Sequence, residues 1–328
     1  MILLVGLIVV ALTFDFMNGR NDAANSIATI VSTRVLSPRY AVAWAAFFNF
    51  IAFLIFGLHV ANTIGTGIIQ AITINDHVIF GALIGAISWQ VITSYFGIPS
   101  SSSHALIGGL VGAGVAHGGS GVIVWAGLGK TVSAIVISPT IGLFLALLLV
   151  LIVSWGFLRV APARADGIFR RVQFVSASLL SLGHGGNDAQ KTMGIITALL
   201  FSHGALTGAF HVPFWVVLSC NGAMALGTLL GGWKIVRTMG SRITRLTPMQ
   251  GVCAETAGAI TLFLATYLGI PVSTTHTITG AIVGVGAARR ASAVRWNVAQ
   301  RIVIAWVITM PAAGIMGALA YYAFGAFH

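Results

Sequence analysis

Long apolar stretches are the feature of this sequence that most restricts its fold. Five segments are near-continuously apolar, at about 40–60, 77–96, 122–158, 212–232 and 296–324. Most of them reach the roughly 20 residues that a helix needs to cross the hydrocarbon core of a bilayer. Alternating segments of about ten residues, which would predict a membrane β-barrel, are absent from the sequence. We therefore expect an all-α polytopic membrane protein with about 10–12 membrane segments.

The distribution of charge agrees with a membrane location. Only 7% of the residues are charged, against about 25% in soluble domains. The net charge is +11, but the Lys and Arg residues fall mostly in short loops, as the positive-inside rule describes for cytoplasmic loops. This excess is therefore no indication of nucleic-acid binding. We expect a multi-pass protein of the cytoplasmic membrane, surrounded by lipid.

Two motifs occur twice in the chain. The longer one, "YFGIPSSSSHALIGGLVGAGVA" at 95–116, returns as "YLGIPVSTTHTITGAIVGVGAA" at 267–288 with half of its positions identical. The shorter one, "GRNDA" at 19–23, returns as "GGNDA" at 185–189. Because the motifs recur in the same order, the sequence predicts two copies of one unit. The predicted parts are a first repeat, a connector and a second repeat, at 1–158, 159–171 and 172–328.

Loops that correspond in the two copies differ in charge. Arg34 and Arg39 follow the first short motif, whereas the matching loop at 201–211 has no Lys or Arg. Conversely, the basic residues between 234 and 245 match a loop at 61–76 that has none. By the positive-inside rule, matching loops lie on opposite sides of the membrane, so the repeats have inverted topology. The same rule makes the connector cytoplasmic and places both termini outside.

Inverted repeats with broken or re-entrant helices are typical of secondary transporters. These proteins bind their solutes near the middle of the bilayer, where helices are interrupted. The alternative is a duplication that merely built a larger structural bundle. It is disfavoured because the most similar stretches of the two copies are polar and helix-breaking.

A run of hydroxyl side chains follows a predicted helix break in each copy. Gly97 with Pro99, and Gly269 with Pro271, interrupt a helix, and the hydroxyl residues then open a new helix as N-caps. A helix N-terminus offers unpaired N–H groups and a partial positive charge, which suit a tetrahedral oxyanion. The alternative is capping and close helix packing alone. We assign the oxyanion contacts to Ser101, Ser102, Ser103, Ser273, Thr274 and Thr275.

The short motifs contain matching acids, Asp22 and Asp188, each directly after an Asn. An Asp at the membrane centre costs about 2.5–3.5 kcal/mol on insertion scales, so such residues are usually functional. Carboxylate and amide oxygens are hard ligands that suit Na⁺, and a proton is the alternative occupant. A buried ion pair with Arg20 or Lys191 is the structural alternative. We assign cation binding to Asn21, Asp22, Asn187 and Asp188, with Asp22 and Asp188 as the sodium ligands if the coupling ion is Na⁺.

The two copies of the short motif are not identical in charge. Lys191 stands where the first copy has Asn25, and we expect both side chains at the anion. Glu255 is a candidate partner of Lys130 or Arg301. Several polar residues have no assigned role: Asp15, whose counterpart is Ser181, Arg20, His104 and His276.

At these motifs the sequence resembles the inorganic phosphate transporter (Pit) family. The resemblance rests on "GRNDAANSIAT", "GHGGNDAQKTMG", "PSSSSH" and "PVSTTH" and covers essentially the whole chain. It implies symport of inorganic phosphate with Na⁺ or H⁺, the Asn-Asp pairs serving cation and substrate and the hydroxyl runs contacting phosphate. It implies no cofactor beyond the coupling ion. Members can form homodimers, and some move sulfate or metal–phosphate complexes.

For the mechanism we expect alternating access, with the cation at Asn-Asp loops and the anion at the two hydroxyl-rich helix starts. A sulfate permease on the same scaffold is the first alternative, because tetrahedral geometry does not separate the two anions. A passive anion channel is the second, although intramembrane acids raise the barrier to anions. An enzyme is disfavoured, since the sequence shows no nucleophile–base constellation and no metal-ligand cluster.

Overall fold

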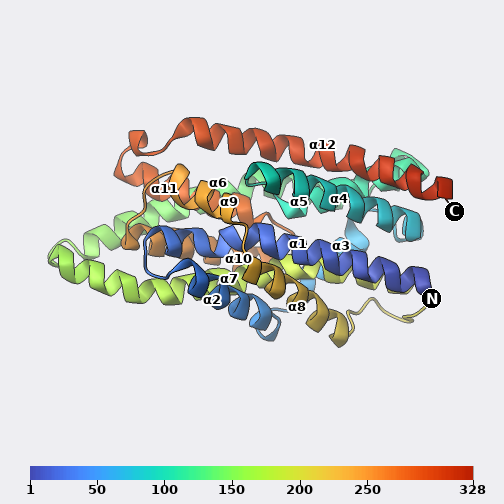
Figure 1. Cartoon of the computed structure of the whole chain (residues 1–328), viewed down its shortest axis with the longest axis horizontal. Helices are drawn as coiled ribbons and strands as arrows, with labels where there is room; N and C mark the ends of the chain where they lie inside the picture. Colours follow the sequence, from blue (N-terminus) through green and yellow to red (C-terminus); the bar gives the residue numbers. More distant parts are fainter. Residues whose placement is uncertain (328) are drawn as a thin grey trace.

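Twelve α-helices build the described part of the chain, residues 1–327 of this computed structural model (Figure 1). The first six are α1 (Ile2–Ser32), α2 (Pro38–Ile51), α3 (His59–Gly67), α4 (Asp76–Phe96), α5 (Ser102–Gly118) and α6 (Trp125–Gly156). The other six are α7 (Pro162–Ser202), α8 (Phe214–Leu230), α9 (Trp233–Arg237), α10 (Pro248–Tyr267), α11 (Thr274–Arg289) and α12 (Trp296–Phe327). Between them lie short turns of 3₁₀ or π helix, at Ala52–Leu54, Ala71–Thr73, Ser120–Val122, Thr238–Arg242 and Ala291–Ala293. The expected all-α fold is confirmed.

Among the described residues, four helices are long and apolar enough to cross a bilayer: α1, α4, α6 and α12. Two bent pairs also qualify if each is taken as one span, α2 with α3 at 80° and α8 with residues 233–242 at 64°. The short helices α5 and α11 have only 17 and 16 residues. The chain is therefore a multi-pass membrane protein with four to six such spans. The larger number of about 10–12 segments stays a prediction.

Both predicted helix breaks are confirmed. The helix α4 ends at Gly97, which has a left-handed φ of 66°, and Gly269 after α10 has a φ of 67°. Glycine adopts this conformation without the steric penalty of a side chain. The next helices begin only after Pro99 and Pro271, because a proline cannot donate a backbone hydrogen bond. Their N-caps are Ser101 and Ser273, whose hydroxyls accept from the backbone N–H of His104 and His276 at 3.2 Å.

Each short helix packs against a long helix from the other half of the chain. The helix α5 lies along α12, and α11 lies along α6. Glycines make this approach possible: a Cβ at Gly112 would overlap the carbonyl oxygen of Gly314, and one at Gly280 would overlap that of Pro139. The close packing that small residues predict here is confirmed.

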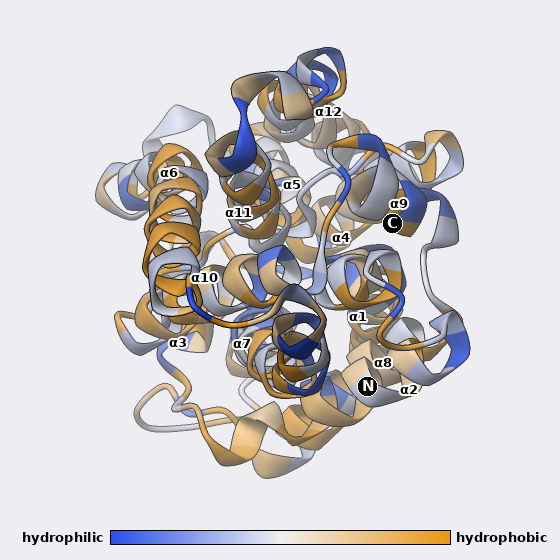
Figure 2. Cartoon of the chain, turned by 90° about the vertical axis from the view of Figure 1, so that its left-hand side faces the viewer, coloured by the Kyte–Doolittle hydropathy of each residue, from blue (hydrophilic) through white to orange (hydrophobic). Residues whose placement is uncertain are grey.

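Polar residues in the middle of α1 and α7 separate two buried apolar clusters. Along α1, residues up to Phe14 belong to one cluster and residues from Ala24 onward to the other. The same change occurs along α7, between Leu180 and Ala189. Large apolar side chains cover the outside instead, as along α6, which is largely hydrophobic in Figure 2. The molecule thus has an apolar exterior for lipid and a polar layer within it.

Both termini lie at one end of the molecule, and the turn between α6 and α7 lies at the other (Figure 1). This turn is short, because α7 already begins at Pro162. Residues 162–171 of the predicted connector therefore form the first turns of α7. The last residue of the predicted second repeat, His328, lies outside the described residues.

Candidate functional site

The two Asn-Asp motifs lie within uninterrupted helices, α1 and α7. The expectation that they form loops was wrong. A continuous helix satisfies its own backbone hydrogen bonds, which lipid cannot do for a loop. The glycines of the motifs serve packing: a Cβ at Gly19 would overlap the carbonyl oxygen of Met224, and one at Gly185 would overlap that of Asn49.

Asp22 contacts the starts of both short helices. Its Oδ2 accepts from Ser102 Oγ at 2.7 Å, and its Oδ1 accepts from Thr275 Oγ1 at 3.2 Å. All three side chains are buried. One carboxylate of α1 therefore joins α5 to α11 at their N-termini.

Asp188 has a different set of partners. It accepts from Thr274 Oγ1 at 3.1 Å and forms an ion pair with Lys191, three residues further along α7. Lys191 also donates to Ser103 Oγ and, at 2.9 Å, to the carbonyl oxygen of Val272. The buried ion pair that the sequence raised as an alternative is present for Asp188.

The asparagines of the two motifs donate hydrogen bonds to α4, α10 and α11, and they leave oxygens without partners. Asn25 donates to the hydroxyls of Thr274 and Thr275 at 3.0 Å each. Asn21 donates to the carbonyl oxygen of Gln90 at 3.2 Å, and Asn187 to Thr266 Oγ1 at 3.0 Å. The Oδ1 atoms of all three asparagines are buried and accept no hydrogen bond within the described chain. Such oxygens are potential cation ligands.

The structure brings most of the assigned side chains together, but two of the assigned hydroxyl groups have a structural role instead. The hydroxyls of Ser101 and Ser273 act as N-caps, which is the structural alternative for these two residues. The oxyanion-type donors that remain are those of Ser102, Ser103, Thr274, Thr275, Asn25 and Lys191, all of them buried.

His184 belongs to this site but was not singled out from the sequence. Its Nε2 lies 3.3 Å from Asp188 Oδ2, and its Nδ1 lies 3.1 Å from Ser26 Oγ. One ligand atom each of Asp22, His184 and Asp188 lie within 4.8 Å of one another. Its position four residues before Asp188, on the same face of a helix, is the signal that could have identified it.

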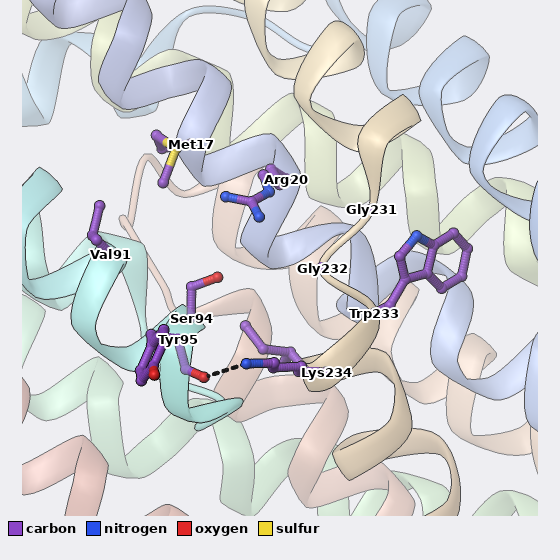
Figure 3. Close-up of a pocket in the computed structure, with 10 residues that line it drawn as sticks. Met17, Arg20, Val91, Ser94, Tyr95, Gly231, Gly232, Trp233 and Lys234 are labelled. Carbon is purple, nitrogen blue, oxygen red and sulfur yellow. Dashed lines mark hydrogen bonds between the residues drawn. The ribbon is translucent and has the colours of Figure 1, made fainter.

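Arg20 lines a cavity of about 340 Å³ between α1, α4 and the bend before α9 (Figure 3), and it forms none of the ion pairs of the described chain. Lys234 lines the same cavity and donates to the carbonyl oxygen of Tyr95 at 2.8 Å. The suggested pairing of Asp22 with Arg20 was therefore wrong. The cavity instead places two positive side chains beside the polar layer.

Glu255 lies apart from these residues, and the suggested pairing with Lys130 or Arg301 was also wrong. It is buried and accepts from Gln173 Nε2 at 2.8 Å and Ser176 Oγ at 2.5 Å. His104 and His276 lie behind the hydroxyl runs, with ring centroids 4.4 Å apart, and His276 stacks on Trp306.

A multi-pass helical protein with charged and hydroxyl side chains gathered in a buried layer belongs to the class of membrane transporters. The sequence profile of the phosphate transporter family matches residues 18–317. The chain therefore belongs to this family, and it is a transporter rather than an enzyme.

The relatives agree with this family membership. The chain is 72% identical to a probable low-affinity inorganic phosphate transporter of Rhizobium meliloti (strain 1021), over 98% of this chain and 96% of the relative. A protein of the same description from Bacillus subtilis (strain 168) is 45% identical over 98% and 97%. The solved structure described as "the sodium-dependent phosphate transporter" superposes over 100% of both chains with a TM-score of 0.92 at 26% identity.

Proposed function

We propose that this chain is a cation-coupled symporter of inorganic phosphate in the cytoplasmic membrane. The observation that carries the proposal is that hydrogen-bond donors at the starts of α5 and α11, together with Lys191, are bonded to the carboxylates of Asp22 and Asp188. Ser102 and Thr275 donate to Asp22, while Thr274 and Lys191 donate to Asp188. These are the donors that a tetrahedral oxyanion between α5 and α11 would need.

Competition for these donors explains how the two solutes are coupled. Phosphate at the helix starts takes the hydroxyls and Lys191 away from the carboxylates. Each carboxylate then needs a positive partner, because a buried unpaired charge costs several kcal/mol. A cation at Asp22 and Asp188, with the free Oδ1 atoms of Asn21 and Asn187 as further ligands, supplies it. Each solute therefore binds better when the other is present, which is a coupling free energy between two sites.

Na⁺ is the cation that the ligands favour, since they are oxygens of carboxylates and amides. The solved relative is described as sodium-dependent, which supports the same ion. Phosphate is favoured over sulfate because phosphate keeps an O–H donor near neutral pH, which an ionised carboxylate accepts. The descriptions of the two relatives also name phosphate as the transported anion and do not name sulfate.

The transport mechanism that fits is alternating access by two inverted repeats, 1–158 and 172–328. The exchange of helices between the halves, α5 on α12 and α11 on α6, supports this division. We place the end with the α6–α7 turn in the cytoplasm, because Arg159, Arg164 and Arg170 lie close to it in the chain. Both termini are then outside. A homodimer stays an expectation from the family.

The test is uptake of radiolabelled phosphate into proteoliposomes. An inward Na⁺ gradient is expected to drive accumulation above equilibrium, and a pH gradient alone is expected to drive less. Excess unlabelled sulfate should compete weakly. Uptake that only equilibrates, whatever the cation gradient, would show a passive anion channel and end the proposal.

A further inference from the structure

Asp15 is a buried acid that the proposed site does not use. It lies in α1 with no exposed surface, within electrostatic reach of the buried Cys220. Within the described chain, no donor meets ordinary hydrogen-bond geometry at either of its carboxylate oxygens, and Asp15 takes part in none of the ion pairs. An unpaired carboxylate in such surroundings costs several kcal/mol unless a positive partner compensates it.

The neighbours of Asp15 are further oxygens without partners. The side chains of Asn18 and Thr192 interact with its carboxylate. Asn18 Oδ1 and Thr192 Oγ1 are themselves buried and unpartnered in the part of the chain that the structure describes. The carboxylate of Asp15 and the side chains of Asn18 and Thr192 thus gather at one buried point. Hard oxygen ligands of this kind suit a small cation such as Na⁺.

The nearest positive side chain does not compensate Asp15. Lys191 is within electrostatic reach of Asp15, but it is already bonded to Asp188, Ser103 and the carbonyl oxygen of Val272. Its charge is therefore shared with a closer carboxylate. When Asp15 is ionised, no positive side chain of the described residues is therefore free to compensate it.

We propose that Asp15, Asn18 and Thr192 form a second cation site, which binds Na⁺ separately from the Asp22–Asp188 site. Asp15 precedes Asp22 by two helical turns, which is about 10 Å along α1. Thr192 follows Asp188 by one turn on α7. The site therefore lies on the same seam between α1 and α7, toward the end that holds both termini (Figure 1).

This site exists in only one half of the chain. The counterpart of Asp15 in the second repeat is Ser181, which is buried but carries no charge. In the proposed topology the site lies between the outside and the phosphate site. Its position relative to the phosphate site, and the one Na⁺ that it adds to each transport cycle, rest on the proposed function, whereas the binding of Na⁺ at Asp15 does not.

The test is direct binding of ²²Na⁺ to the purified full-length chain, measured by scintillation proximity at constant ionic strength. Asp15→Asn is expected to bind one Na⁺ fewer per chain than the wild type. Asp22→Asn is expected to keep the Na⁺ at Asp15 while losing phosphate uptake. Thr192→Val, which removes one neutral ligand, should weaken the affinity for Na⁺ at the Asp15 site by roughly tenfold.

Thr197→Val is the matched control, since Thr197 is also buried in α7 with an unpartnered hydroxyl but lies outside both sites. It should bind as the wild type does. If Asp15→Asn and Thr192→Val bind as much Na⁺ as the wild type, with the same affinity, the site does not exist. Unchanged Na⁺ binding with an altered pH dependence of uptake would assign a proton to Asp15 and overturn the Na⁺ site. The proposed function fails separately, through the wild-type uptake assay.

Discussion

The two acids at the centre of the molecule occupy matching positions in the two sequence copies but differ in their partners. Asp22 is held by neutral hydroxyls, those of Ser102 and Thr275. Asp188 has one hydroxyl, the ammonium of Lys191 and the imidazole of His184 around it. Asp22 in the first half therefore lacks a positive partner, whereas the matching Asp188 in the second half has one.

This difference assigns separate tasks to the two halves. A carboxylate with only neutral donors favours a cation most, because nothing else compensates its charge. A carboxylate paired with Lys191 instead orients that ammonium, which also contacts Ser103 at the start of α5. Asp22 is thus expected to be the main cation ligand, and Asp188 to orient Lys191 toward the anion site until phosphate takes that ammonium over.

The strongest test of this division is Asp22→Asn. The variant keeps the shape of the side chain but removes the charge, so we expect Na⁺-driven phosphate uptake to fall roughly 100-fold or more. Asp166→Asn is the matched control, because Asp166 forms an exposed pair with Arg170, and such pairs contribute little. Normal accumulation by Asp22→Asn in proteoliposomes would remove Asp22 from the coupling mechanism.

The pairing of Asp188 with Lys191 predicts a non-additive effect on stability. Asp188→Asn and Lys191→Gln each leave one buried charge alone, which costs about 3–5 kcal/mol. The double variant leaves none and should unfold at a higher temperature than either single variant. Thermal unfolding of the four proteins in detergent, combined as a double-mutant cycle, measures the coupling. Additive losses would mean that the two charges do not stabilise each other.

The hydroxyls at the helix starts should show a smaller effect, on substrate affinity. Ser102→Ala combined with Thr274→Ala removes one donor from each short helix. Hydrogen bonds to a charged group are worth about 1.5–3 kcal/mol, so the half-saturation concentration for phosphate should rise at least roughly tenfold. Thr261→Val, a buried residue of α10 whose hydroxyl bonds only to the Ala257 carbonyl, serves as the control. An unchanged half-saturation concentration would place the anion elsewhere.

The sequence could predict the helix breaks and helix starts, because these features depend on residues that are neighbours in the chain. The break after α4 could be predicted from Gly97 and Pro99, because each of them restricts the backbone at its own position. Ser101, which follows them, predicted the start of the new helix. The repeat then predicted one hydroxyl-rich helix start in each half, and in the structure both of these starts contact Asp22.

The features that the sequence did not predict depend on residues that are neighbours in space but not in the chain. Gly19 next to polar residues suggested a loop, but its role is to admit the backbone of α8 against a continuous helix. The partners of Glu255 are Gln173 and Ser176, neutral residues of α7 that give no charge signal to search for. His184 was overlooked although its spacing from Asp188 was informative.

Arg20 offers the finest test of the difference between the halves, since its counterpart in the second copy is Gly186. It adds positive charge to a cavity beside Asp22 without pairing with that acid. Positive potential next to a site raises the local concentration of anions, and salt screens it. Arg20→Gln should therefore raise the half-saturation concentration for phosphate by about two- to threefold at low ionic strength, and by less at high salt. Arg171→Gln, an exposed substitution near the start of α7, is the control. A large effect that is independent of salt would mean instead that Arg20 contacts the bound anion, and the positive charge of the anion site would then come from both halves.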